Sequence, residues 1–352
     1  MSSNRPLGRM LVSKAKNQTF EVDIDKVSLG SFYTTKSAWL TDQVRHFIEK
    51  ALAESNGCVL DPFAGDGHLL ETIKTDLVLG KQVKRATGFD IQGDSWPIND
   101  SLVAIPNPRR AVIVTNPPYL ANHSAKRKGV DQLVAKYFDG SSQKNLYRIA
   151  LEKALESADY VVAIIPETFL LSTFPKHRLE LAVVIQDHLF GDTDAPALVA
   201  CFAEDEHADA HIFTGNQSIG ILSELLALRE FAAPKQKIVF NDPSGRIGLR
   251  AVDGSDGKSP IAFIAAGDFE YPSDSVVTSS RLMTYLEMPV LNDLEVAKVI
   301  EESNSILRRI RIDSGDLVLA PFKGNDRNGK RRRRLDYFLA RGILNTARMH
   351  TQ

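Results

Sequence analysis

Short apolar runs alternate with helical patterns between residues 58 and 214. Apolar residues recur at helical spacing from Leu40 to Leu52, with Ser37 as a candidate N-cap and Gly57 after the last turn. Further helices are expected after residue 67 and over 145–156. Runs too short for a typical helix predict buried strands at 58–61, 86–89, 111–115, 160–165, 182–185, 197–202 and 211–213. This alternation predicts an α/β fold with a doubly wound, mostly parallel, Rossmann-like sheet.

The pattern changes after Gly215. Helices are expected near 219–231 and 293–309, and Pro, Gly, Asp and Ser separate short β-like runs at 237–240, 247–251, 260–265, 317–322 and 337–339. The basic run at 330–334 is then expected in a loop or at a hairpin tip. We therefore expect an N-terminal extension (1–28), a catalytic α/β domain (29–214) and a C-terminal α+β domain (215–352).

Composition describes an ordinary globular protein with room for two cores. It has 352 residues, 43% hydrophobic and 25% charged. No apolar run approaches the ~18 residues of a membrane helix, and no signal-peptide core follows Met1, so we expect a cytoplasmic protein without a membrane partner. Cys58 and Cys201 lie far apart in apolar surroundings, which predicts neither disulfides nor a bound metal. The net charge is −1, so any nucleic-acid-binding surface must be local.

The tetrapeptide Asn116-Pro117-Pro118-Tyr119 follows the apolar run 111–115. Two prolines end the strand, and the residue before a proline is held extended, which places Asn116 at the strand's carboxyl end. Open α/β sheets bind their ligands at that edge. An amide, two rigid carbonyls and an aromatic ring can receive a planar group that bears an NH2. The alternative is a turn that only ends a strand.

A glycine-containing loop, 61–67, follows the strand 58–61 and precedes a helix. It lacks the GxGxxG pattern and the lysine of a phosphate-binding loop. With Asp61 and Asp66, it suits a cationic amine or sulfonium better than a pyrophosphate. Asp90 follows the next strand, 23 residues after Gly67, where a carboxylate can hold ribose hydroxyls; a solvated strand end is the alternative. Asp100 offers another carboxylate near the sheet edge.

Together these residues resemble the S-adenosylmethionine-dependent DNA adenine-N6 methyltransferases. The tetrapeptide matches the family's catalytic motif, the loop 61–67 matches its cofactor loop, and 30–35 resembles the motif that contacts the cofactor's methionine. The resemblance covers roughly 28–205 and implies S-adenosyl-L-methionine as cofactor. The implied cofactor-binding residues are Phe32, Tyr33, Thr34, Asp61, Pro62, Phe63, Ala64, Gly65, Gly67, Asp90, Ile91, Asp100, Ser101, Leu102 and Asn116.

The motif order resembles the gamma arrangement of these enzymes. Only 55 residues separate Asp61 from Asn116, which leaves no room between them for a recognition domain. The chain after about residue 215 is therefore expected to carry target recognition. The resemblance implies duplex DNA as substrate, base flipping, action as a monomer, and a restriction endonuclease that shares the site.

The resemblance also implies a mechanism. Two acceptors, the Asn116 side-chain oxygen and the Pro117 carbonyl, would take the two N–H groups of adenine N6 and direct its lone pair at the sulfonium methyl. Pro117 and Pro118 hold both oxygens rigidly. Tyr119 would stack on the flipped base, with Phe190 as the second ring.

Basic residues are the candidates for DNA contact. One set lies in the polar segment 122–129, expected as a loop over the site. Residues 306–352 carry 12 Lys and Arg against 4 Asp and Glu, and a solvated charge run is the alternative there. The candidates are Lys126, Arg127, Lys128, Lys323, Arg327, Lys330, Arg331, Arg332, Arg333 and Arg334.

Two other kinds of function stay open. Cytosine N4, adenine in RNA or a glutamine amide in a protein could accept the methyl group, although the cytosine enzymes more often have Ser at the position of Asn116. A non-catalytic nucleic-acid-binding protein on the same fold is the second alternative, and methyl transfer itself would exclude it.

Overall fold

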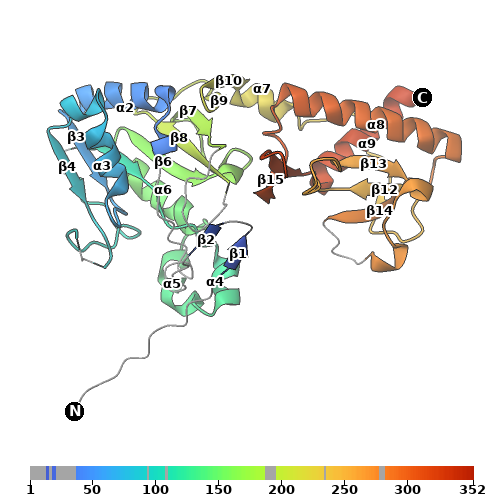
Figure 1. Ribbon diagram of the computed structural model, residues 1–352, viewed down its shortest axis with the longest axis horizontal. Helices are drawn as coiled ribbons and strands as arrows, with labels where there is room; N and C mark the ends of the chain where they lie inside the picture. Colours follow the sequence, from blue (N-terminus) through green and yellow to red (C-terminus); the bar gives the residue numbers. More distant parts are fainter. Residues whose placement is uncertain are drawn as a thin grey trace, which may run out of the picture. The chain divides into compact units, whose positions relative to one another are not determined.

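The computed structural model describes residues 13–15, 18–20, 37–92, 95–107, 110–186, 196–233, 235–276 and 282–352. The chain divides into two compact units (Figure 1). The first comprises Met1–Phe169 and Thr173–Ser218, and the second comprises Leu170–Ser172 and Ile219–Gln352. Each unit has its own sheet and its own helices.

The first unit is built on a mostly parallel sheet. Its described strands follow the order β10-β9-β7-β8-β6-β5-β3-β4. The pairs β3–β4, β3–β5, β5–β6 and β7–β9 are parallel, whereas β8 runs antiparallel to both β6 and β7. The strands are β3 (Cys58–Asp61), β4 (Arg85–Gly88), β5 (Val112–Thr115), β6 (Val161–Pro166), β7 (Leu179–Val184), β8 (Ala197–Phe202), β9 (His211–Thr214) and β10 (Gln217–Ile221). The predicted α/β class is confirmed.

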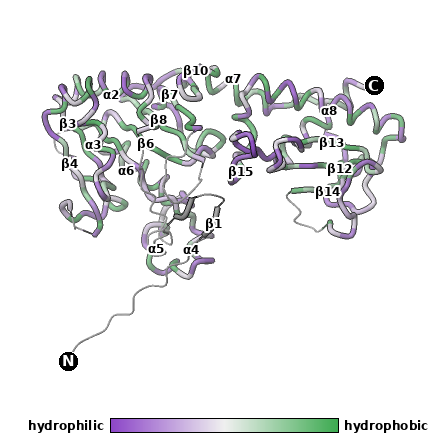
Figure 2. Tube along the Cα trace, in the orientation of Figure 1, coloured by the Kyte–Doolittle hydropathy of each residue, from purple (hydrophilic) through white to green (hydrophobic). Residues whose placement is uncertain are grey.

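Helices cover both faces of this sheet. Val112 and Val114 of β5 share a core cluster with apolar residues of α2 (Asp42–Glu54) and α3 (His68–Thr75). Ile113 lies between them and, because strand side chains alternate, points to the opposite face. That face carries α6 (Leu146–Ser157), which packs against β6. Each fully buried valine or isoleucine here contributes roughly 1.5–3 kcal/mol, and β6 and β8 are hydrophobic along their length (Figure 2).

The segment 122–129 was expected as a loop, and that prediction is wrong. It forms α4 (Asn122–Lys128), followed by α5 (Asp131–Phe138) (Figure 1). The buried side chain of Ala125 anchors α4 in a second core cluster with Leu120 and Val134. Gly129, with a φ of +70°, ends α4 by donating its N–H to the last carbonyls of the helix. A single small buried residue among basic ones is too weak a pattern to predict a helix.

The second unit has an antiparallel sheet, which confirms the α+β class. Its strand order is β11-β14-β12-β13, and α8 packs along both α9 and β13. A separate hairpin joins β15 to β16. The elements are α7 (Leu222–Ala227), β11 (Val239–Phe240), β12 (Ile247–Arg250), β13 (Ala262–Ala265), β14 (Met283–Glu287), α8 (Asp293–Asp313), β15 (Ala320–Asn325), β16 (Arg331–Arg334) and α9 (Tyr337–Thr351).

Shorter elements complete the described fold. Within the predicted N-terminal extension, β1 (Ser13–Ala15) pairs antiparallel with β2 (Gln18–Phe20). The 3-10 turns are Ser37–Trp39, Leu79–Lys81, Glu167–Phe169, Ala266–Asp268 and Ser273–Ser275. No helix in the described parts of the chain is long and apolar enough to cross a membrane.

Local capping chemistry corrects two further predictions. Ser37 does not cap α2, because it starts a 3-10 turn and Thr41 holds the N-cap position. Residues 337–339 are not β-like: the side chain of Asp336 accepts a hydrogen bond from the Leu339 N–H at 2.9 Å and so begins α9.

The arginine run is also placed differently from the prediction. Arg331–Arg334 is the strand β16 itself and not the hairpin tip. The tip is the turn before it, where the carboxylate of Asp326 accepts hydrogen bonds from the N–H groups of Asn328 and Lys330, both at 2.9 Å. The arginine run is therefore part of a paired strand, with an irregular register against β15.

Candidate active site

The glycine loop, Asp90 and the tetrapeptide lie where β3, β4 and β5 end. Backbone hydrogen bonds join the ends of β3 and β4: the Phe89 N–H donates to the Asp61 carbonyl and the Ala64 N–H donates to the Phe89 carbonyl, both at 2.9 Å. The glycine loop 61–67 is therefore fixed to the strand that leads to Asp90. This is the edge at which open α/β sheets bind ligands.

Two glycines shape the loop, and an indole covers them. Gly65 and Gly67 have φ values of +48° and +82°, a region that side chains rarely adopt. The Trp96 Nε1–H donates to the Gly65 carbonyl at 2.9 Å, and a Cβ on Gly67 would lie 2.8 Å from the Trp96 ring. Trp96 was not predicted from the sequence, because only the turn of the chain after β4, where Asp90 bridges Ile98, brings it to the loop.

Asp61 is buried beneath the loop. Its Oδ1 accepts hydrogen bonds from the Phe63 N–H at 3.0 Å and from the Thr115 hydroxyl at 2.8 Å. Burial raises the pKa of Asp61 to about 7, against the lowering effect of these two donors. The Thr115 bond ties the glycine loop to the residue directly before Asn116, which links the two sequence motifs.

Asp90 binds the same loop from the end of β4. Its carboxylate accepts hydrogen bonds from the Gly65 N–H at 3.0 Å and from the Gln92 N–H at 2.9 Å. Ile91 beside it is 60% exposed, unusual for a large apolar side chain. The pair presents a carboxylate and an open apolar surface to the same edge.

The two carboxylate oxygens of Asp100 differ in their hydrogen bonding. Its Oδ2 accepts from the Lys136 ammonium at 2.8 Å and from the Tyr137 hydroxyl at 2.9 Å, both on α5. Its Oδ1 is buried without a hydrogen-bond partner among the residues that the structure describes. A buried carboxylate oxygen in that state fits an amine donor. Sequence reasoning did not find Lys136 and Tyr137, since no motif includes them.

The residues after Asp100 are built into the fold. Ser101 is buried, and its hydroxyl accepts from the side-chain amide of Asn99 at 2.8 Å. Leu102 belongs to the core cluster that contains Leu120, with Phe63 packed against it. The segment 100–102, predicted to bind the adenine of the cofactor, therefore lies between the glycine loop and the helices α4 and α5.

The tetrapeptide brings Asn116 and Tyr119 into direct contact. The Tyr119 hydroxyl lies 2.7 Å from the Asn116 Oδ1 and 2.7 Å from the Ile164 carbonyl. Its ring packs edge-on against Tyr147, with ring centroids 6.3 Å apart. Burial raises the pKa of Tyr119 well above its ordinary value, so the phenol stays a neutral donor. Pro117 is buried and Pro118 half-buried, which fixes the backbone between the two side chains.

Several predicted residues are placed elsewhere or lie outside the described residues. Phe32, Tyr33, Thr34 and Phe190 belong to the latter group. Lys126, Arg127 and Lys128 form the last turn of α4. The other basic candidates belong to the second unit, where Lys323, Arg327 and Lys330 are exposed and Arg333 is 5% exposed.

Comparison with known proteins agrees with this geometry. Residues 17–183 match the model of the Eco57I restriction-modification methylase family. This part of the chain is therefore similar to the restriction-modification methyltransferases. The match covers a little under half of the chain and includes the glycine loop, Asp90, Asp100 and the tetrapeptide. The predicted resemblance is confirmed at this level. No curated protein matches the chain.

Solved structures of restriction-modification proteins are also similar to this chain. The modification subunit of a putative type I restriction enzyme from Vibrio vulnificus YJ016 has 15% identity and a TM-score of 0.34, over 53% of this chain and 47% of that one. The type IIG endonuclease BpuSI has 17% identity and a TM-score of 0.36, over 54% and 28%. The type IIL enzyme MmeI, solved in complex with DNA, has 11% identity and a TM-score of 0.37, over 56% and 40%. This chain spans less than half of each of these proteins.

Proposed function

We propose that this methyltransferase domain transfers the methyl group of S-adenosylmethionine to the N6 amine of adenine in duplex DNA, within a restriction-modification system. The observation that carries the proposal is the arrangement of Asn116 and Pro117 at the end of β5. They stand next to Thr115, whose hydroxyl binds the Asp61 carboxylate under the glycine loop. Acceptors for an amine thus lie beside the loop that the family match covers.

The residues of the loop edge fit the cofactor. The unpartnered Oδ1 of Asp100 would accept the exocyclic amine of the cofactor's adenine, and exposed Ile91 would lie against the adenine ring. Asp90 would bind the ribose hydroxyls, for which its present bond to the Gly65 N–H must lengthen or be shared. When bound, the cofactor supplies an electrophilic sulfonium methyl.

Asn116 and Pro117 would activate the target amine. Its lone pair is delocalised into the ring, and two carbonyl acceptors that take its N–H groups would localise that lone pair. The C–N bond would form as the methyl–sulfur bond breaks; S-adenosylhomocysteine would leave, and the amine would lose one proton to water. The Tyr119 hydroxyl, 2.7 Å from the Asn116 oxygen, orients the amide. For the predicted stacking on the flipped base, the ring of Tyr119 would turn from its edge-on contact with Tyr147.

The second unit is proposed to recognise the target sequence. Its α8, α9 and hairpin carry the net positive charge of residues 306–352. The predicted gamma order, the monomeric state and the paired restriction endonuclease belong to the same proposal.

Methyl transfer from labelled S-adenosylmethionine tests the proposal, with mixed-sequence duplex DNA, RNA and protein as parallel acceptors. We expect label in N6-methyladenine of the DNA. Asn116→Ala should lower transfer by about a hundredfold or more, the scale of losing one preorganised transition-state hydrogen bond. Its binding of S-adenosylhomocysteine should stay close to that of the unmodified protein.

The other acceptors are outcomes of the same experiment. Label in N4-methylcytosine, RNA or protein, with none in DNA adenine, would reassign the substrate. Undiminished methyl transfer by Asn116→Ala would contradict the proposed activation of the amine by Asn116. If the protein binds nucleic acid but transfers no methyl group to any acceptor, the result would favour the non-catalytic alternative.

A further inference from the structure

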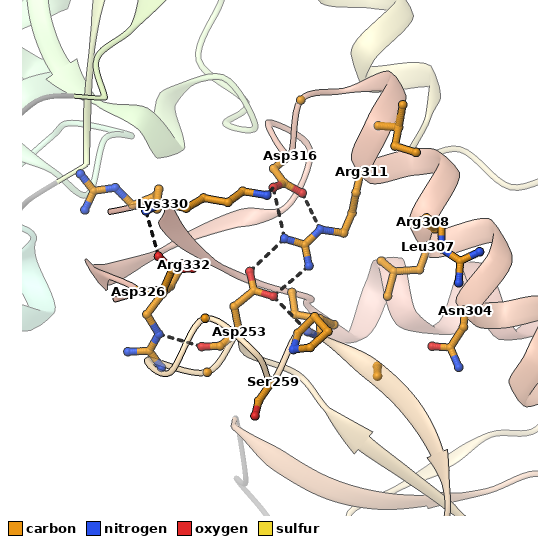
Figure 3. A pocket seen from close by; sticks show the side chains of 18 residues that line it. Asp253, Ser259, Asn304, Leu307, Arg308, Arg311, Asp316, Asp326, Lys330 and Arg332 are labelled. Atoms are coloured by element: carbon orange, nitrogen blue, oxygen red, sulfur yellow. Dashed lines mark hydrogen bonds and ion pairs between the residues drawn. The ribbon is translucent and has the colours of Figure 1, made fainter. Parts of the chain in front are cut away.

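An open groove of about 800 Å³ lies within the second unit (Figure 3). One wall is α8, and the other is formed by the loop 253–262 together with the turn and first residues of β16. The loop and the turn pack tightly: the Arg327 N–H donates to the Ser255 carbonyl at 3.1 Å, and a Cβ on Gly257 would collide with the side-chain amide of Asn328. The groove is therefore bounded by three segments that the tertiary structure brings together.

A network of ion pairs forms one side of the groove. Arg311 binds Asp253 through two hydrogen bonds of 2.8 and 3.0 Å, and binds Asp316 through two of 2.6 and 3.1 Å (Figure 3). The Lys330 ammonium reaches Asp316 at 2.8 Å from the hairpin turn. Burial opposes the ionisation of Asp316, but Arg311 and Lys330 outweigh it and lower the pKa of that carboxyl. These carboxylates are thus neutralised within the fold.

The remaining charge of the groove is positive. Five cationic and three anionic side chains line it, and the network already uses two of the anions. The third anion, Asp326, accepts hydrogen bonds from backbone N–H groups of the hairpin turn. Arg308 is exposed on α8 and has no hydrogen bond or ion pair with any other residue that the structure describes.

Two arginines of β16 line the opposite wall. Arg332 is fixed in place, because its Nε–H donates to the Asp253 carbonyl at 2.7 Å and its guanidinium lies 4.9 Å from the centre of the Phe322 ring. Arg331 comes one residue before it and also lines the groove. Guanidinium groups on both walls suit phosphate, which they bind in bidentate fashion.

We propose that this groove binds the sugar-phosphate backbone of the DNA substrate, with Arg308 and Arg331 as phosphate contacts from opposite walls. The inference rests on the proposed function and names the surface that holds the substrate. The lining also includes Ile261 and Leu307, which are buried, and Ile312, whose exposed apolar side chain offers a surface for a sugar. Ile312 is 72% exposed, so the groove is open to solvent along this part of α8.

The groove separates the predicted DNA-contact residues of this unit into two sets. Lys330, Arg331 and Arg332 line it, together with Arg308, which sequence reasoning did not select. Lys323, Arg327, Arg333 and Arg334 do not line it. The arginine run is thus expected to act through only part of its length.

A matched pair of double variants tests the proposal. Arg308→Ala/Arg331→Ala removes one arginine from α8 and one from β16, both in the groove. Arg309→Ala/Arg334→Ala removes the same charge from the same two elements, outside the groove. Binding to a labelled mixed-sequence DNA duplex is measured by fluorescence anisotropy over a range of salt concentrations, and urea unfolding confirms that both variants fold.

The groove variant should bind DNA more weakly, and the slope of log K against log salt should fall by roughly two. The control variant should keep a steeper slope. Equal losses of DNA affinity in both variants, or an unchanged salt slope in the groove variant, would overturn the proposal. It would also be overturned if binding of RNA or of an acidic protein depended on the groove arginines while binding of DNA did not. Methyl transfer by the unmodified protein is scored separately, so that groove-dependent DNA binding without transfer would contradict only the proposed function.

Discussion

At the scale of single residues, the site depends on carboxylates whose two oxygens have different partners. Asp61 is enclosed, and its Oδ1 accepts two donors of the fold. Asp100 has donors on Oδ2, whereas its Oδ1 is buried without one among the described residues. The first arrangement shapes a loop, and the second is open to a ligand. Residue type alone does not distinguish them.

Asp61 predicts a pH dependence of stability. Its pKa of about 7 in the folded protein exceeds its ordinary value of 3.8, so the folded state holds a proton that the unfolded state has lost between these two pH values. Stability should therefore fall as pH rises from about 4 to 7, by at most about 1.4 kcal/mol per pH unit from this group.

Urea unfolding at pH 5 and pH 7.5 measures this effect. Asp61→Asn cannot ionise but can still accept from Phe63 and Thr115, so its stability should change less between the two pH values. An identical pH dependence in the variant and the unmodified protein would show that other groups cause it.

At the scale of elements, α5 connects the tetrapeptide after β5 to the carboxylate of Asp100. The chain leaves the tetrapeptide, forms α4 and α5, and returns Lys136 and Tyr137 to Asp100. The Lys136 side chain is 60% exposed, and such an ion pair contributes little. Tyr137 is half-buried, so its hydroxyl is the stronger candidate for orienting the carboxylate.

We expect Tyr137→Phe to weaken the binding of S-adenosylhomocysteine roughly fivefold, the loss of a hydrogen bond of about 1 kcal/mol. Lys136→Ala should change this affinity little. Calorimetric titration measures both, with S-inosylhomocysteine as the comparison ligand because it lacks the amine that would face Asp100. The same loss for both ligands would mean that Tyr137 acts on the fold and not through Asp100.

At the scale of the whole molecule, the two compact units predict unfolding that is not two-state. Both tryptophans, Trp39 and Trp96, belong to the first unit. Intrinsic tryptophan fluorescence therefore reports that unit, whereas far-UV circular dichroism reports the helices and strands of both.

The substitution Arg311→Ala should make the second unit unfold at a lower urea concentration. The substitution leaves Asp253 and Asp316 without the half-buried guanidinium that they share, although Lys330 still reaches Asp316, and this should cost up to about 3 kcal/mol. In urea, the dichroism should show an earlier step while the fluorescence transition stays in place. Arg309→Ala, an exposed neighbour on the same helix, is the control and should shift neither signal. A parallel shift of both signals would mean that the units unfold together.

The strands and the position of the tetrapeptide at the end of a strand were readable from the sequence, because both depend on local patterns. Buried strands such as β5 and β6 are continuous apolar runs, and prolines after β5 can only end it. The α4–α5 pair was missed since its few buried residues do not form a periodic pattern. The start of α9 was misread because a single cap, Asp336, decides it.

The sequence by itself determined the α/β class, the order of the motifs and the residues at the strand ends, because parallel strands bring their carboxyl ends to one edge. Only the tertiary structure decided which side chains complete that edge: Trp96 over the glycines, and Lys136 and Tyr137 on Asp100. It also decided which arginines line the groove of the second unit. Contacts between residues far apart in the chain follow from how helices and loops pack on the sheet, and no local pattern encodes that packing.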